Sequence, residues 1–174
     1  MRKSKLIIIS LVILLGLPVV NLQAQTTTVI AQVFAEVIPA LTATEISQLN
    51  FGRFSPETQG GAILVTPDGL RTSSGTVELS GGTHNPGSFY LTGESDAAFS
   101  IMLPTGPAIL TNTNNSKTMQ VNNWMSIPAQ GIGTGLLTRG SQEVKVGATL
   151  VVGPMEQNPV GIYTGTYAIT FGYN

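Results

Sequence analysis

The 174-residue sequence contains no cysteine, one histidine and one tryptophan, and only 10% of its residues are charged. The missing cysteine excludes disulfides, cysteine-ligated zinc, a thiol nucleophile and a lipid-modified N-terminal cysteine. A formal net charge of −1 excludes a broadly basic nucleic-acid-binding protein. The few charges also exclude disorder driven by charge repulsion. Hydrophobic residues make up 42% of the chain, and its length suits one globular domain.

The first 24 residues have the pattern of a secretory signal peptide. Basic residues at positions 2, 3 and 5 precede an apolar run from Leu6 to Val20, and a polar stretch follows around the small residue Ala24. The run of about 15 residues is shorter than the roughly 20 needed to span a bilayer as a helix. We therefore expect cleavage between Ala24 and Gln25 and export to the bacterial periplasm, cell surface or extracellular space. No later run is long enough to predict an integral membrane segment.

Residues 25–174 have the periodicity of β-strands and are predicted to form a single domain. Apolar residues recur at every second position in several segments, most clearly at Val144, Val146, Ala148, Leu150 and Val152. Successive side chains of a strand point to opposite faces, so this alternation predicts antiparallel sheets with one buried face. Turn residues rich in glycine and proline separate the segments at roughly 8–12-residue intervals, which is typical of a β-sandwich.

Three segments are predicted to lie outside the strands. The only stretch with helical character is Thr42–Leu49, which we expect to form at most a turn. Gly60-Gly61 is interpreted as a turn between strands. Gly131–Gly135 resembles a fragment of a phosphate-binding loop but lacks the remaining residues of either nucleotide-binding motif, so it is interpreted as a flexible loop.

The single histidine does not predict a catalytic or metal site. His84 lies in a glycine-rich loop, and a Ser/His/Asp triad would have to use it, yet the sequence has no Gly-x-Ser-x-Gly motif to supply the nucleophile. A zinc site would need further histidines or cysteines. We therefore interpret His84 as an exposed loop residue.

Two other groups of residues have both a chemical and a structural interpretation. Glu94 and Asp96 lie close enough in sequence for glycosidic acid/base work or Ca²⁺ binding, but they bracket a turn between strands. Trp124 could stack against a sugar, but the alternation around it favours core packing. We expect no enzyme activity, no cofactor and no metal, with a glycosidase using Glu94 and Asp96 as the enzymatic alternative.

The two ends of the mature chain carry the strongest functional signal. Within residues 25–38, one face of an extended segment presents alternating small apolar side chains: Val29, Ala31, Val33, Ala35 and Val37. The last strand is predicted from Gly161 to Asn174. Its apolar face begins fourteen residues from the end with a glycine and finishes on a penultimate tyrosine: Gly161, Tyr163, Tyr167, Ile169, Phe171 and Tyr173.

This C-terminal pattern resembles the C-terminal motif of chaperone–usher pilus subunits. The mature chain is also similar to spore coat protein U domains and to a kindred family of uncharacterised secreted bacterial domains. The residues that carry the resemblance are Leu49-Asn50-Phe51-Gly52, Val146–Leu150 and the spacing Gly161-x-Tyr163-x-Gly165-x-Tyr167.

The resemblance implies an immunoglobulin-like β-sandwich that lacks its seventh strand. In the pilus family a periplasmic chaperone first fills the gap, and an N-terminal extension of the next subunit then replaces it, a form of β-strand addition. The resemblance therefore implies a structural fibre subunit whose partners are copies of itself or related subunits, a chaperone and an usher. Residues 25–38 would be the donor strand.

A second reading of the same residues stays open at this point. In this reading, residues 25–38 are the first strand of a complete sandwich, because a strand paired within its own chain and a strand donated to a neighbour share one sequence pattern. The protein would then be a monomeric secreted or surface binding or coat protein of unknown ligand. The two readings differ only in topology.

Overall fold

A computed structural model describes residues 25–174, so the predicted signal peptide lies outside the described residues. The chain divides into two units, Met1–Glu36 and Val37–Asn174. In the first unit, residues 25–36 form no strand and their side chains are exposed. The second unit contains all the sheet structure described below.

The second unit consists of eleven strands and one short 3₁₀ turn, with no α-helix among the described residues. In chain order they are β1 (Thr42–Ser47), β2 (Arg53–Val65), β3 (Arg71–Ser80), β4 (Gly87–Thr92), β5 (Ala98–Met102), β6 (Ala108–Asn112), β7 (Thr118–Ile127), β8 (Gly131–Leu136), η1 (Thr138–Gly140), β9 (Ser141–Val152), β10 (Tyr163–Thr164) and β11 (Thr170–Tyr173).

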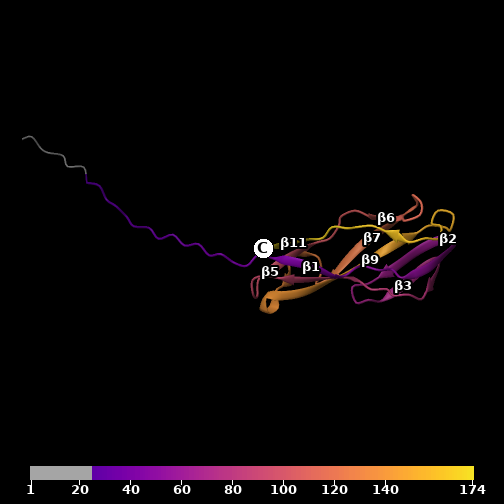
Figure 1. The fold of residues 1–174 in the computed structure, drawn as a ribbon. Coiled ribbons are helices and arrows are strands. Elements are labelled where there is room, and N and C mark those ends of the chain that lie inside the picture. Colours follow the sequence, from indigo (N-terminus) through magenta and orange to yellow (C-terminus); the bar gives the residue numbers. More distant parts are fainter. Residues whose placement is uncertain (1–24) are drawn as a thin grey trace, which may run out of the picture. The chain divides into compact units, whose positions relative to one another are not determined.

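The strands form two sheets in which every neighbouring pair is antiparallel. The larger sheet follows the order β1-β4-β9-β7-β6-β10, and β2 joins it by pairing with β9 and with β3. The smaller sheet has the order β11-β5-β8. Figure 1 shows β1, β5 and β11 gathered at one end of this unit and β2, β3 and β6 at the other. The prediction of an all-β, immunoglobulin-like antiparallel sandwich is confirmed.

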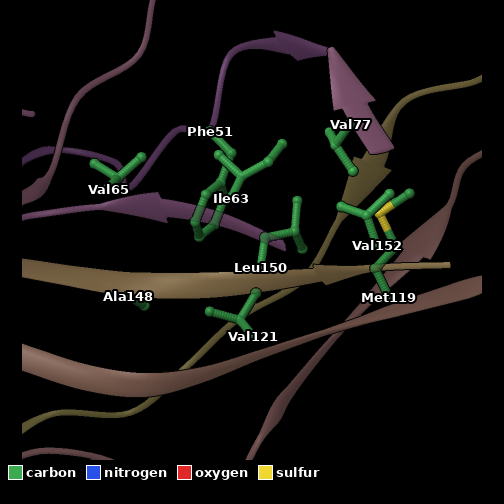
Figure 2. Close-up of a cluster of buried hydrophobic side chains, with 9 residues drawn as sticks. All are labelled: Phe51, Ile63, Val65, Val77, Met119, Val121, Ala148, Leu150 and Val152. Carbon is green, nitrogen blue, oxygen red and sulfur yellow. The ribbon is translucent and has the colours of Figure 1, made fainter. Parts of the chain in front are cut away.

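Strand β9 connects two separate clusters of buried side chains. The first core cluster, drawn in Figure 2, is Phe51, Ile63, Val65, Val77, Met119, Val121, Ala148, Leu150 and Val152. The second core cluster is Leu91, Phe99, Ile101, Leu103, Leu137, Val144 and Val146. The predicted alternation in β9 is confirmed, because the five residues of the predicted alternation are all buried and contribute to both clusters: Val144, Val146, Ala148, Leu150 and Val152.

The prediction of a turn over Thr42–Leu49 is wrong, because Thr42–Ser47 is a strand. It pairs with β4 in the register Thr42↔Thr92 to Ser47↔Ser88. Two threonines give this segment β-propensity, and the available edge of β4 supplies its ladder hydrogen bonds. Sequence periodicity does not report such a long-range partner.

Two glycine-rich segments also belong to strands and not to turns or loops. Gly60 lies inside β2 with a φ of 72°, next to the register shift between Pro56 and Gly61, so Gly60-Gly61 forms a β-bulge. Residues 131–136 form β8, which pairs with β5. Gly135 is required there because a Cβ would collide with the ring of Phe99.

The predicted final strand is interrupted. Its first part, β10, pairs with β6, and its last part, β11, pairs with β5 in the other sheet, while residues 165–169 belong to no ladder. The chain crosses from one sheet to the other in this interval. Gly165 passes so close to the backbone of Ile109 that a Cβ would not fit.

Tyr173 closes the end of the sandwich at which β11 lies. Its hydroxyl donates to the carbonyl oxygen of Pro39 at 3.0 Å and accepts from the backbone N–H of Glu94 at 2.6 Å. The same ring lies against Gly93, where a Cβ would collide with the hydroxyl. The penultimate tyrosine therefore holds the segment before β1 against the turn that follows β4.

Candidate functional site

Three strands of the larger sheet pair with one other strand only: β1, β3 and β10. Strand β1 pairs with β4 alone and β10 pairs with β6 alone, so they are the two ends of the strand path. Because all the pairs between them are antiparallel, β1 and β10 run in opposite directions. A strand inserted between these edges would be antiparallel to one of them and parallel to the other.

An apolar cleft of about 1160 Å³ separates the chain segments that continue these two edges. One wall is formed by Glu45 and residues 48–56, and the other by Met155 and residues 158–167. The floor consists of side chains from β4, β6, β7 and β9: Phe89, Ala108, Leu110, Met119, Val121, Trp124 and Leu150. Three of these floor residues, Met119, Val121 and Leu150, belong to the first core cluster. The cleft therefore opens directly onto the core.

Stacked aromatic rings bound the cleft on the side of the second core cluster. The rings of Trp124 and Tyr167 are stacked with centroids 4.7 Å apart, and Phe89 meets Tyr167 edge-on at 6.4 Å. The indole N–H of Trp124 donates to the carbonyl oxygen of Gly106 at 3.2 Å. Beyond these rings, Ile169, Phe171 and Tyr173 pack against the second core cluster. These rings cover that half of the sandwich, whereas the cleft lies over the first core cluster, whose residues are nevertheless buried.

Tyr167 is the cleft residue with the most perturbed ionisation. Its hydroxyl oxygen is buried and has no hydrogen-bond partner among residues 25–174. Burial, together with the smaller effect of the nearby Glu45 carboxylate, raises the pKa of Tyr167 to about 12. The hydroxyl is thus a neutral, unsatisfied polar atom at the inner end of an apolar cleft.

This shift predicts a stability loss at alkaline pH. The pKa of Tyr167 is about 12 in the folded state and about 10 in the unfolded state, so its contribution is complete below pH 10 and is lost as pH rises through 12. We expect Tyr167→Phe to lose less stability than the wild-type protein over this interval. Urea unfolding from about pH 9 to about pH 12 measures the difference, and identical pH profiles would contradict the assignment.

The C-terminal residues singled out by the sequence divide between the two halves of the sandwich. Gly161, Tyr163 and Tyr167 line the cleft, and the hydroxyl of Tyr163 donates to the carbonyl oxygen of Pro159 at 2.9 Å. Gly161 has a φ of 156° and lies against the side chain of Asn112, which leaves no room for a Cβ. The motif therefore builds one wall of the cleft and, further on, part of the cover over the second core cluster.

The N-terminal residues singled out by the sequence are all solvent-exposed. Val33 is 98% exposed and Val37 is 97% exposed, and Val29, Ala31 and Ala35 are exposed as well. The opposite face of the same segment also carries large exposed side chains, at Ile30 and Phe34. A stretch of this hydrophobicity in open solvent is typical of a segment that binds elsewhere.

Sequence reasoning missed the floor residues contributed by β6 and the wall formed by residues 48–56. The alternation of Ala108 and Leu110 in the sequence indicates a strand with one apolar face. It does not show that this strand borders the cleft. Leu49–Gly52, noted only as part of the resemblance, turns out to lie in this wall.

The remaining candidates do not converge on a site. His84 is exposed in a loop between β3 and β4, and Glu94 and Asp96 lie in the turn after β4. Asp96 donates its backbone N–H to the carbonyl oxygen of Leu137 at 2.8 Å. Among residues 25–174 there is no cluster of three or more histidine, cysteine or acidic residues. Over the same residues, no helix has the length and hydrophobicity needed to cross a membrane.

Comparison with known families gives a match over residues 41–173 to the domain of unknown function DUF4402. The matched residues include both walls and the floor of the cleft, and they begin after residues 25–38. No curated protein and no solved structure matches the chain.

Proposed function

The chain belongs to the DUF4402 family, whose domain has no known function, and we propose that it is a non-catalytic structural subunit of a secreted or cell-surface fibre that assembles by β-strand donation. The donor strand is residues 25–38, and the acceptor is the cleft of another copy or of a related subunit. The observation that carries this proposal is the cleft, with its apolar floor, between the chain segments that continue the single-sided strands β1 and β10.

The cleft wall and the donor segment contain similar numbers of residues. One wall contains the nine consecutive residues 48–56, of which 53–56 belong to β2. The alternating part of the donor segment, Val29–Val37, has a matching length. An inserted strand would satisfy backbone groups along both walls, as β-strand addition requires.

The chemistry of the donor segment fits the chemistry of the cleft. The cleft floor is apolar, and the donor face consists of small apolar side chains. Burying three valines and two alanines would contribute on the order of 5–8 kcal/mol by area, as an upper value. None of these five residues carries a charge, so the inserted face brings no charge of its own into the cleft.

Export and partners follow from the same proposal. A subunit with an open cleft exposes apolar surface and strand edges, which is an aggregation hazard before assembly. A signal peptide over residues 1–24 would deliver it to the periplasm, where a chaperone would cover the cleft and an usher would exchange the chaperone for a donor strand. The assembled fibre would then lie at the cell surface or outside the cell.

The size of the mature chain in solution tests this function. We expect residues 25–174 to form polymers whose length grows with protein concentration, and residues 39–174 not to form these polymers. Sedimentation velocity over a range of concentrations measures both. If both forms are stable monomers at every concentration, the fibre function fails and a monomeric binding or coat protein becomes the better account.

A further inference from the structure

A patch of exposed apolar side chains lies at the open end of the cleft, next to the turn between β6 and β7. We call Met155, Val160 and Ile162 the rim; they are 52%, 92% and 69% exposed and all line the cleft. Strand pairing shows where the rim lies. Tyr163, which follows Ile162 directly, lies opposite Asn112, the last residue of β6. The rim therefore lies at the end of the sandwich opposite Tyr173.

The proposed donor strand can leave the cleft at one end only. Toward the second core cluster, the stacked rings of Trp124 and Tyr167 and the contact of Tyr173 with Pro39 close the sandwich. Toward the rim, the lining side chains of Val160 and Ile162 are exposed to solvent, so the cleft reaches the surface there. The donor segment is followed directly by its own folded unit, so the end carrying Val37 has to lie at the rim.

This placement fixes the direction of the donor strand. The C-terminal segment runs from Val160 at the rim to Tyr173 at the closed end, and a donor strand whose Val37 lies at the rim runs antiparallel to it. If the donor strand filled the cleft of its own chain, the short connection of residues 38–41 would have to form a tight turn. The donor would then run antiparallel to β1 and parallel to the C-terminal segment, which is the opposite direction. The direction therefore favours a second copy as the donor.

The connection between donor strand and donor body is short. Only residues 38–41 separate Val37 from Thr42, the first residue of β1, and they span at most about 18 Å. The body of the donating copy must therefore lie within this distance of the acceptor's rim. Contact between a donor body and an acceptor rim is head-to-tail, which produces an open polymer and not a closed dimer.

We propose that Met155, Val160 and Ile162 form the surface against which the body of the donating copy packs. This inference rests on the proposed strand donation, and it adds a second contact to it. Covering the rim removes three large apolar side chains from water beside the inserted strand. The contact would stabilise the junction between subunits and limit bending of the fibre at the short connection.

Paired variants separate the rim contact from strand binding. Val160→Asp with Ile162→Asp changes the rim, and Ile132→Asp, at an 89% exposed residue of β8, is the matched control. In the intact mature chain, we expect the rim variant to weaken polymerisation by about tenfold or more. We expect the control to polymerise like the wild-type protein.

Binding of a synthetic peptide spanning Thr26–Ile38 provides the second measurement. It is made on the mature chain carrying Val33→Asp and Val37→Asp, whose own donor strand is disabled, with and without the rim substitutions. Because Val160 and Ile162 also line the cleft, we expect the rim substitutions to weaken peptide binding, but by clearly less than they weaken polymerisation, since the peptide has no body to contact the rim. The rim contact would be overturned if the rim variant polymerised like the wild-type protein. It would also be overturned if the rim substitutions weakened polymerisation and peptide binding equally. Absence of peptide binding in every variant would overturn strand donation itself.

Discussion

Substituting Val33 and Val37 together by aspartate is expected to reduce polymerisation of the mature chain by at least about 100-fold. Each valine loses roughly 1.5–3 kcal/mol of burial when it no longer enters the cleft, and about 1.4 kcal/mol corresponds to a tenfold change in affinity. A carboxylate that did enter would be buried against an apolar floor without a partner. Both residues are almost fully exposed in the structure, so the substitutions should leave the fold of the sandwich unchanged. Sedimentation velocity measures the loss of polymer, and unfolding curves check the fold.

The opposite face of the donor segment provides the matched control. Ile30→Asp with Phe34→Asp places the same charges in the same segment, on side chains that point away from the face chosen for insertion. We expect this variant to polymerise much more strongly than Val33→Asp with Val37→Asp. The reverse ranking would show that the other face enters the cleft, and equal polymerisation of both variants would contradict donation by this segment.

The parts of the fold that sequence alone predicted are those governed by local alternation. The five buried positions of β9 are an example, because a central strand with one core-facing side must repeat every second residue. The inward-facing residues of the C-terminal segment were found for the same reason. The alternation of apolar residues therefore identified the side chains that face the core. It also predicted that the domain is a β-sandwich.

The parts that sequence did not predict depend on distant partners. Thr42–Ser47 became a strand because β4 offered an edge, and Gly131–Leu136 became a strand because Gly135 fits against Phe99. The division of the final strand between two sheets likewise depends on Gly165 crossing the backbone of Ile109. The donor face was visible in the sequence, whereas the cleft it would fill required the positions of four strands and two connecting segments.

Addition of the donor peptide is expected to stabilise a chain that cannot donate its own strand. A ligand that binds only the folded state, at 100 times its dissociation constant, adds about 2.7 kcal/mol of stability. For a domain of this size, that corresponds to a rise in melting temperature of about 10 °C. The stabilisation should come from the half of the sandwich around the first core cluster, over which the cleft lies.

The measurement that tests strand donation most directly is the melting temperature of the Val33→Asp, Val37→Asp mature chain with the peptide spanning Thr26–Ile38. The control is the same peptide with aspartate at positions 33 and 37. The account predicts a rise of about 10 °C with the native peptide and almost none with the substituted peptide. An unchanged melting temperature with saturating native peptide would mean that the sandwich is complete without a donor and would contradict fibre assembly by strand donation.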